Sequence, residues 1–144
     1  MNDFRFYHPI EVRYGDLDPQ GHVNNARYLT YMEQARIAYI QHLALWKGGS
    51  FMDIGIILAD VQVTFLSPIL FGEQVRVWLQ VTHLGNKSIT MDYLIDQFET
   101  GQKYATGSTV LVAFDYREHR SIPVPEAWRS KIMEFERLPE KGHP

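Results

Sequence analysis

Two carboxylates and one imidazole lie close together near the start of the chain. Asp16, Asp18 and His22 share a short stretch that is rich in glycine, proline and aspartate, which is typical of a turn. A carboxylate in such a turn can attack a carbonyl carbon or activate a water molecule. The same residue types are also common turn formers and helix caps. These residues alone therefore leave a catalytic and a structural interpretation open.

A long helix is predicted directly after this turn. Apolar residues recur at helical spacing over about residues 26–45, on a face too broad for a surface helix, and Asn24 or Asn25 can cap its start. Lys47 followed by Gly48 is expected to end it. The first N–H groups of a helix have no partner within the helix and carry partial positive charge. Such a terminus can polarise a carbonyl and hold a developing oxyanion.

The rest of the chain is dominated by strand patterns. Polar and apolar residues alternate in an N-terminal run, and four further runs are joined by short, turn-rich connections, as in an antiparallel meander. Pro125 can open a short C-terminal helix. A long apolar helix and an antiparallel sheet must bury each other, which predicts an α+β fold with the sheet curled round the helix. The predicted strands are 4–14, 54–65, 74–84, 88–99 and 103–116, and the short helix is 126–137.

Composition narrows the class of protein. The 144 residues suit a single domain, which we expect over residues 1–138, with a polar tail at 139–144. The net charge of −3 comes without a basic stripe, which argues against a nucleic-acid partner. The absence of cysteine excludes disulfides, thiolate catalysis and zinc–thiolate sites. No run is long enough to span a membrane and no signal peptide is visible, so a cytoplasmic location is expected.

One extended motif resembles a known family. The pattern Tyr14-x-Asp16-x-Asp18-x-x-Gly21-His22-Val23-Asn24-Asn25-x-x-Tyr28-x-x-Tyr31-x-Glu33-x-Ala35-Arg36 is similar to the signature of the 4-hydroxybenzoyl-CoA thioesterase family and its acyl-CoA thioesterase relatives. Residues 65–73 and 84–88 resemble later connections of the same family. The resemblance implies a hotdog fold, in which an antiparallel five-stranded sheet wraps around a long central helix.

The resemblance also implies roles for individual residues. Asp18 would act on the thioester carbonyl as nucleophile or general base, and the adjacent Pro19 supports this alignment. Gly21 would give the turn its backbone freedom. The backbone N–H of Asn25 would stabilise the oxyanion. His22 is either a structural residue or one that orients a water, caps the loop or contacts substrate.

Several neighbours are interpreted as structural. Asp16 is expected to organise the loop as a hydrogen-bond acceptor. Glu33 and Arg36 lie three apart on the helix and can pair, as an ion pair at a subunit interface, with Glu33 as a reserve catalytic candidate. Three helix tyrosines are assigned to the core and to an interface rather than to substrate binding: Tyr28, Tyr31 and Tyr39.

Coenzyme A carries phosphates, so basic residues are expected around its entry. Lys87 and Ser88 are the first candidates, and Arg117 and Arg120 the second, although each can equally be a solvated surface residue. The chain has no glycine-rich phosphate loop. His8 and the residues of the Asp/His cluster match no standard zinc or calcium spacing, so neither metal nor cofactor is expected.

The predicted reaction is hydrolysis of an acyl-CoA thioester to the free acid and coenzyme A, and the sequence does not specify the length of the acyl group or whether it is aromatic or aliphatic. An isolated hotdog leaves one sheet edge and one helix flank exposed, and the resemblance implies a homodimer that pairs them, or a homotetramer of two such dimers. Two alternatives remain open. One is a module that binds acyl-CoA or acyl-carrier protein without turnover, and the other is a hotdog hydratase or dehydratase.

Overall fold

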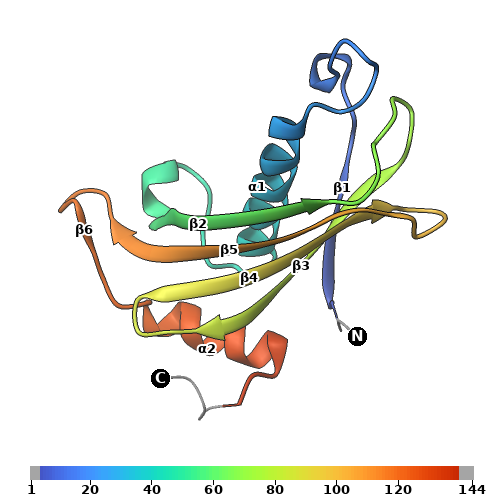
Figure 1. Ribbon diagram of the computed structural model, residues 1–144. Helices are drawn as coiled ribbons and strands as arrows, with labels where there is room; N and C mark the ends of the chain where they lie inside the picture. Colours follow the sequence, from blue (N-terminus) through green and yellow to red (C-terminus); the bar gives the residue numbers. More distant parts are fainter. Residues whose placement is uncertain (1–3, 140–144) are drawn as a thin grey trace. The chain divides into compact units, whose positions relative to one another are not determined.

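The computed structural model of the protein describes residues 4–139 and confirms the α+β prediction (Figure 1). The sheet is antiparallel, with strand order β1-β3-β4-β5-β2, and β6 pairs with β5 off this path. The elements in chain order are β1 (Phe6–Ile10), α1 (Asn25–His42), β2 (Ile56–Phe65), β3 (Val75–Leu84), β4 (Ser88–Gln97), β5 (Lys103–Asp115), β6 (Arg120–Ser121) and α2 (Glu126–Glu136). Short 3-10 turns lie at Tyr14–Asp16 and Phe51–Asp53.

Within residues 4–139 the sheet has six strands, where five were predicted. The additional strand β6 follows a turn in which the Asp115 carboxylate accepts hydrogen bonds from the N–H groups of Arg117 and Glu118, at 2.9 and 3.0 Å. His119 in this turn adopts a positive φ of 55°. The turn reverses the chain, so that Ser121 lies opposite Phe114 of β5. The reversal depends on side-chain hydrogen bonds, which an alternation pattern does not reveal.

The described chain packs as two compact units. Unit 1 contains the residues up to 39, together with 63–79 and 93–107. Unit 2 contains residues 40–62 and 80–92 and the chain from 108 onward. Helix α1 and the four long strands each contribute to both units. The single domain over 1–138 stays a prediction, and residues 140–144 of the predicted tail lie outside the described residues.

In unit 1, α1 packs against three strands. Phe6 of β1 meets the Tyr39 ring edge-on at 5.4 Å, and Tyr28 meets Phe65 of β2 edge-on at 4.9 Å. Arg36 donates a hydrogen bond to the Tyr93 hydroxyl of β4 at 3.0 Å. The broad apolar face that was read from the sequence therefore serves to contact several strands at once. The buried hydrophobic residues that α1 contributes to unit 1 are Tyr28, Tyr31, Met32, Ala35 and Tyr39.

In unit 2, α2 lies beside the β3–β4 turn (Figure 1). Arg129 donates a hydrogen bond to the Gly85 carbonyl at 2.7 Å, and Glu136 accepts one from the Val81 N–H at 2.9 Å. Trp128 and Ile132 form the buried side of this helix. These contacts hold α2 to the hairpin by polar bonds as well as by apolar burial.

Helix α1 ends earlier than predicted. The N–H groups of Ala44 and Leu45 bond back to the carbonyls of Gln41 and Ile40, at 3.0 and 2.9 Å, and Ala44 has a φ of 57°. This is the Schellman arrangement, which satisfies the last carbonyls of a helix and usually employs glycine at the left-handed position. An alanine takes that position here, so the glycines at 48 and 49 were a misleading stop signal.

Strand β1 is also shorter than the predicted 4–14. It ends at Ile10, and the chain turns at Tyr14–Asp16, where the Asp16 N–H bonds to the Arg13 carbonyl at 2.9 Å. The Asp16 carboxylate accepts the Arg13 N–H in return, at 3.0 Å. This pair of bonds closes a turn, so the alternation read from the sequence continues past the end of the paired strand.

Candidate active site

The turn that precedes α1 is closed by its own main chain. The Asp18 N–H donates to the His22 carbonyl at 2.7 Å, and the Gly21 N–H donates to the Asp18 carbonyl at 3.0 Å. Leu17 and Val23 form an antiparallel bridge beside them. Gly21 has a φ of 83°, a conformation that glycine adopts without a steric cost. The turn is therefore a small, fixed frame around Asp18.

The two carboxylate oxygens of Asp18 have different surroundings. Oδ1 accepts hydrogen bonds from the N–H groups of Gln20 and His22, at 2.9 and 3.2 Å. Oδ2 accepts no hydrogen bond from the residues that the structure describes, and the side chain is partly exposed. One oxygen thus orients the carboxylate, while the other can face a water molecule or a carbonyl carbon.

The helix start follows at once. The Asn24 side chain accepts a hydrogen bond from the Ala26 N–H at 2.9 Å, which makes Asn24 the N-cap and Asn25 the first helical residue. By helix geometry the Asn25 N–H has no intrahelical acceptor. The same segment of unit 1 therefore carries a fixed carboxylate and, seven positions later, an N–H group available to an oxyanion.

Asp16 connects the turn to the helix. Its Oδ2 accepts hydrogen bonds from the Arg13 N–H at 3.0 Å and from the Tyr31 hydroxyl at 2.8 Å. Its Oδ1 lies 3.6 Å from Nε of Arg27, and its carbonyl accepts the Asn24 N–H at 2.8 Å. The expected role of Asp16 as a loop-organising acceptor agrees with these contacts.

The contact between Asp16 and Tyr31 was missed from the sequence, where Tyr31 was assigned to the core. The signal was present, because a buried tyrosine hydroxyl usually needs a hydrogen-bond partner and an unassigned acid preceded the helix. Burial raises the pKa of Tyr31 well above its usual range, and the hydrogen bond to Asp16 raises this pKa further. The phenol therefore stays protonated and remains a donor.

His22 takes part in the turn through its main chain. Its N–H and carbonyl both bond to Asp18, and it forms a bridge with Leu70. Within the described part of the chain, its imidazole makes no hydrogen bond. The contacts of His22 thus support a structural role, with the ring left available to a ligand or to solvent.

The predicted pair on α1 is present. Arg36 and Glu33 lie 4.0 Å apart, but the guanidinium is buried while the Glu33 side chain is 66% exposed. The stronger contact of Arg36 is its hydrogen bond to Tyr93. Glu33 does not meet any of the candidate catalytic side chains through a described contact.

The candidates for coenzyme A binding all lie in unit 2. Lys87 precedes β4 and donates a hydrogen bond to the Ser121 hydroxyl of β6 at 3.3 Å, whereas Ser88 opens β4. Arg117 forms an ion pair with Asp53 at 2.8 Å, at a cavity of about 210 Å³ that both residues line. Ser121 was not anticipated from the sequence. The charge of Lys87 is therefore more available to a phosphate than that of Arg117.

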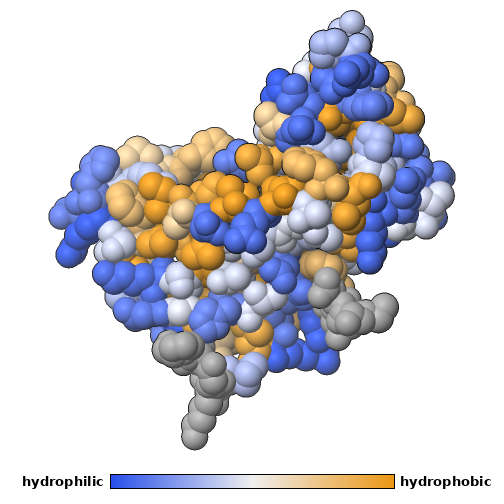
Figure 2. All heavy atoms as spheres, viewed as in Figure 1, coloured by the Kyte–Doolittle hydropathy of each residue, from blue (hydrophilic) through white to orange (hydrophobic). Residues whose placement is uncertain are grey.

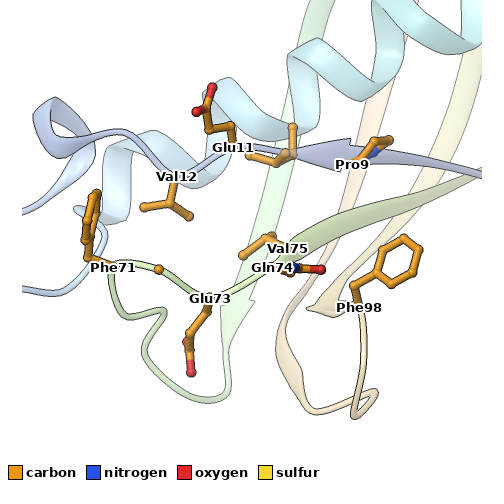
Figure 3. Close-up of a pocket in the computed structure, with 10 residues that line it drawn as sticks. Pro9, Glu11, Val12, Phe71, Glu73, Gln74, Val75 and Phe98 are labelled. Atoms are coloured by element: carbon orange, nitrogen blue, oxygen red, sulfur yellow. The ribbon is translucent and has the colours of Figure 1, made fainter.

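A cavity of about 590 Å³ in unit 1 is separate from the predicted site (Figure 3). Figure 3 shows the rings of Phe71 and Phe98 on opposite sides, with the carboxylates of Glu11 and Glu73 pointing in different directions. Glu73 is engaged, because it accepts the Tyr104 hydroxyl at 2.8 Å. None of the four candidate catalytic residues lines this cavity.

Residues 4–139 were compared with the requirements of a metal site and of a membrane-spanning helix. Within that range no group of three or more histidine, aspartate and glutamate side chains is placed to hold a metal ion. In the same part of the chain, no helix is both long and apolar enough to cross a membrane.

Comparison with known proteins gives consistent results. The model of the thioesterase-like superfamily matches residues 12–132. The long-chain acyl-CoA thioesterase FadM of Escherichia coli is 24% identical, with 88% of this chain and 96% of that protein covered. The 1,4-dihydroxy-2-naphthoyl-CoA hydrolase of Synechocystis is 26% identical, with 91% and 96% covered.

A solved structure gives the same result. The thioesterase of Thermus thermophilus, complexed with coenzyme A and zinc, is 38% identical, with a TM-score of 0.83 and with 96% of this chain and all of that chain covered. This likeness confirms the predicted hotdog fold and the resemblance on which it was based.

Proposed function

Because the chain belongs to the thioesterase-like superfamily and is a thioester hydrolase, we propose that it hydrolyses an acyl-CoA to the free acid and coenzyme A. The observation that carries this proposal is the turn of unit 1, where Asp18 keeps one carboxylate oxygen unbonded ahead of the Asn25 N–H. Relatives with names that state an acyl-CoA substrate, and a neighbour solved with coenzyme A, support the choice of thiol.

The chemistry follows from these two groups. As general base, the Asp18 carboxylate takes a proton from a water whose oxygen bonds to the thioester carbon. The oxyanion that develops accepts the Asn25 N–H, and the carbon–sulfur bond then breaks. The coenzyme A thiolate leaves and takes up the proton. As nucleophile, Asp18 would bond to the same carbon first, with the carbon–sulfur bond breaking and the coenzyme A thiolate leaving; water would then hydrolyse the resulting anhydride to the free acid and the Asp18 carboxylate.

Gly21 and His22 complete the proposed catalytic set by shaping the turn. The positive φ of Gly21 allows the chain to reverse within the turn. The His22 N–H then reaches Oδ1 of Asp18. In both chemical routes these two residues act on the orientation of the carboxylate.

We assign the nucleotide part of coenzyme A to Lys87, Ser88 and Arg117 in unit 2. The side chain of Lys87 is exposed and its described contact is with an uncharged hydroxyl, which leaves its charge for a phosphate. Arg117 would have to exchange its ion pair with Asp53. Lys87 is therefore the main expected contact.

We also propose that the working form is a homodimer, or a homotetramer of two such dimers. Strand β2 is a ten-residue edge strand, and Ile57 and Leu58 are 40% and 45% exposed. Figure 2 shows hydrophobic residues at the surface over β2. A long, apolar, unpaired edge pairs readily with a second chain, and a twofold axis lets two copies of one strand satisfy each other.

The test is a hydrolysis panel over short-chain, long-chain and aromatic acyl-CoAs, repeated with Asp18→Asn. The amide removes the negative charge with little change of shape, so we expect kcat to fall by roughly a thousandfold or more for every substrate cleaved by the wild type. Glu118→Gln, at an exposed turn residue, is the matched control and should retain full activity. Acyl-pantetheines, which lack the nucleotide, should show a raised KM.

Three outcomes would contradict the proposal. Hydrolysis that is unchanged in Asp18→Asn would remove Asp18 from the mechanism. Binding of acyl-CoA without turnover by the wild type would instead indicate a binding module. Hydration of an enoyl-CoA, measured in the same panel, would indicate a hydratase.

A further inference from the structure

Asp16 is the most heavily bonded side chain of the turn, yet it has no part in the proposed chemistry. Its side chain is 14% exposed and its carboxylate meets the Arg13 N–H, the Tyr31 hydroxyl and the Arg27 guanidinium. The last of these contacts, at 3.6 Å, involves a largely exposed arginine and is weak. The Tyr31 hydroxyl, at 2.8 Å, is therefore the principal side-chain partner.

The main chain around Asp16 reaches both components of the proposed site. Asp16 lies two residues before Asp18, and its carbonyl accepts the N–H of Asn24, which caps α1 and precedes Asn25. A displacement of Asp16 is therefore expected to change the distance and orientation between the Asp18 carboxylate and the Asn25 N–H. The chemistry needs the two groups to be placed to within a fraction of an ångström.

Tyr31 is a rigid anchor for Asp16. It lies two turns into α1 and is 2% exposed, so its ring is held by the packing of unit 1. The hydroxyl remains a donor, because burial and the neighbouring carboxylate both raise the pKa of this phenol. A charge-assisted hydrogen bond to such a fixed donor restrains a loop more firmly than a bond to a solvated side chain does.

We propose that Tyr31 is a positioning residue, which acts through Asp16 to hold the Asp18 carboxylate in register with the Asn25 N–H. This inference rests on the proposed function. Tyr31 does not touch the substrate. Its effect should therefore appear in kcat, because the transition state requires the register of the two groups, and much less in KM.

The test compares two buried tyrosines that each donate to a carboxylate at 2.8 Å. Tyr31→Phe removes the bond to Asp16, and Tyr104→Phe removes the bond to Glu73. Both variants should lose a similar amount of stability in urea unfolding. We expect Tyr31→Phe to lower kcat about tenfold or more with KM within about twofold, while Tyr104→Phe keeps its kcat within about twofold.

A double-mutant cycle tests the route through Asp16. Asp16→Ala should lower kcat as Tyr31→Phe does. The double variant should have a kcat only slightly lower than either single variant, because both changes break the same hydrogen bond. Independent, multiplicative losses would overturn the proposal, and so would an unchanged kcat in Tyr31→Phe or an equal loss in Tyr104→Phe. Should Asp16→Ala not fold, the split between kcat and KM in Tyr31→Phe decides alone.

The failure of this inference is distinct from the failure of the proposed function. If Asp18→Asn abolishes hydrolysis while Tyr31→Phe keeps its kcat, only the positioning role is wrong. If Asp18→Asn keeps its activity, the proposed mechanism is wrong whatever Tyr31→Phe does.

Discussion

At the scale of single residues, the two carboxylate oxygens of Asp18 differ in their hydrogen bonding. Both of its oxygens belong to one carboxylate, but two N–H groups of the turn hold Oδ1 and none of the described residues bonds Oδ2. The carboxylate is thus oriented through one oxygen, while the other has no hydrogen bond from the described residues. A structural turn-forming aspartate and a catalytic one make the same Oδ1 bonds, which is why the sequence left both interpretations open.

The role assigned to Asn25 can be tested at its backbone. Proline is well tolerated at the first position of a helix, and it lacks only the N–H. The preceding Asn24 is the N-cap, a position with extended backbone that suits a residue before proline. We therefore expect Asn25→Pro to fold normally and to lose roughly a hundredfold to a thousandfold in kcat. The measurement is steady-state hydrolysis beside circular dichroism.

The control for this prediction is Asn25→Ala, which keeps the N–H and removes only the exposed side chain. Its kcat should remain close to that of the wild type. If Asn25→Ala and Asn25→Pro lose the same activity, then the side chain and not the main chain carries the role.

At the scale of the elements, β1, β3 and β4 share a partly buried cluster of charged and aromatic side chains that the sequence did not reveal. In unit 1 the Arg76 guanidinium forms an ion pair with Asp96 at 2.8 Å and lies over the rings of Tyr7, Trp78 and Phe98, at 5.5, 4.6 and 5.0 Å. The Asp96 side chain is only 6% exposed. The Arg76 side chain is 18% exposed, and the Asp96 carboxylate also accepts the Trp78 N–H at 3.2 Å.

This cluster predicts a large effect on stability from one small change. Asp96→Ala leaves the Arg76 guanidinium packed against three aromatic rings without its counter-charge. The free energy of unfolding should therefore fall by about 3 kcal/mol. Urea unfolding followed by fluorescence measures this loss. Glu118→Ala, which removes an exposed carboxylate, should change it by less than about 0.5 kcal/mol. A loss below about 1 kcal/mol for Asp96→Ala would show that the aromatic rings, not the charges, stabilise these strands.

At the scale of the whole molecule, the exposed apolar edge of β2 is the feature that a monomer does not account for. It is an edge strand of ten residues with exposed apolar side chains and no proline within it. Monomeric proteins usually protect such an edge with charges, proline or a covering segment. The simplest explanation is pairing with the β2 strand of a second copy.

This pairing predicts a change of assembly from a surface substitution. Ile57 and Ala59 lie on the same face of β2 and are both exposed. The double variant Ile57→Lys/Ala59→Lys should therefore be monomeric in sedimentation velocity and keep its circular dichroism spectrum, whereas the wild type should be a dimer or a tetramer. Ala127→Lys/Ser130→Lys adds the same charges to α2 and should keep the wild-type assembly. A monomeric wild type would refute the proposed pairing.

The sequence by itself determined the order and type of the long elements, though not the short strand β6, and it identified the turn that carries the proposed chemistry. These features are local: alternation, helical spacing and turn residues act over a few neighbouring positions, and Asp18, Gly21 and Asn25 are near each other along the chain. Where the local signal was ambiguous, the prediction was wrong, as at the end of α1, where Ala44 rather than a glycine takes the left-handed position.

The tertiary structure alone decided which distant residues meet. Tyr31 reaches Asp16, Arg76 reaches Asp96 and Lys87 reaches Ser121 only because the folded chain brings separate segments together. It also decided that Asn24, rather than Asn25, caps the helix, since that choice depends on which side chain turns toward the Ala26 N–H. Such contacts depend on side-chain directions and on packing between elements, and no pattern within one element carries that information.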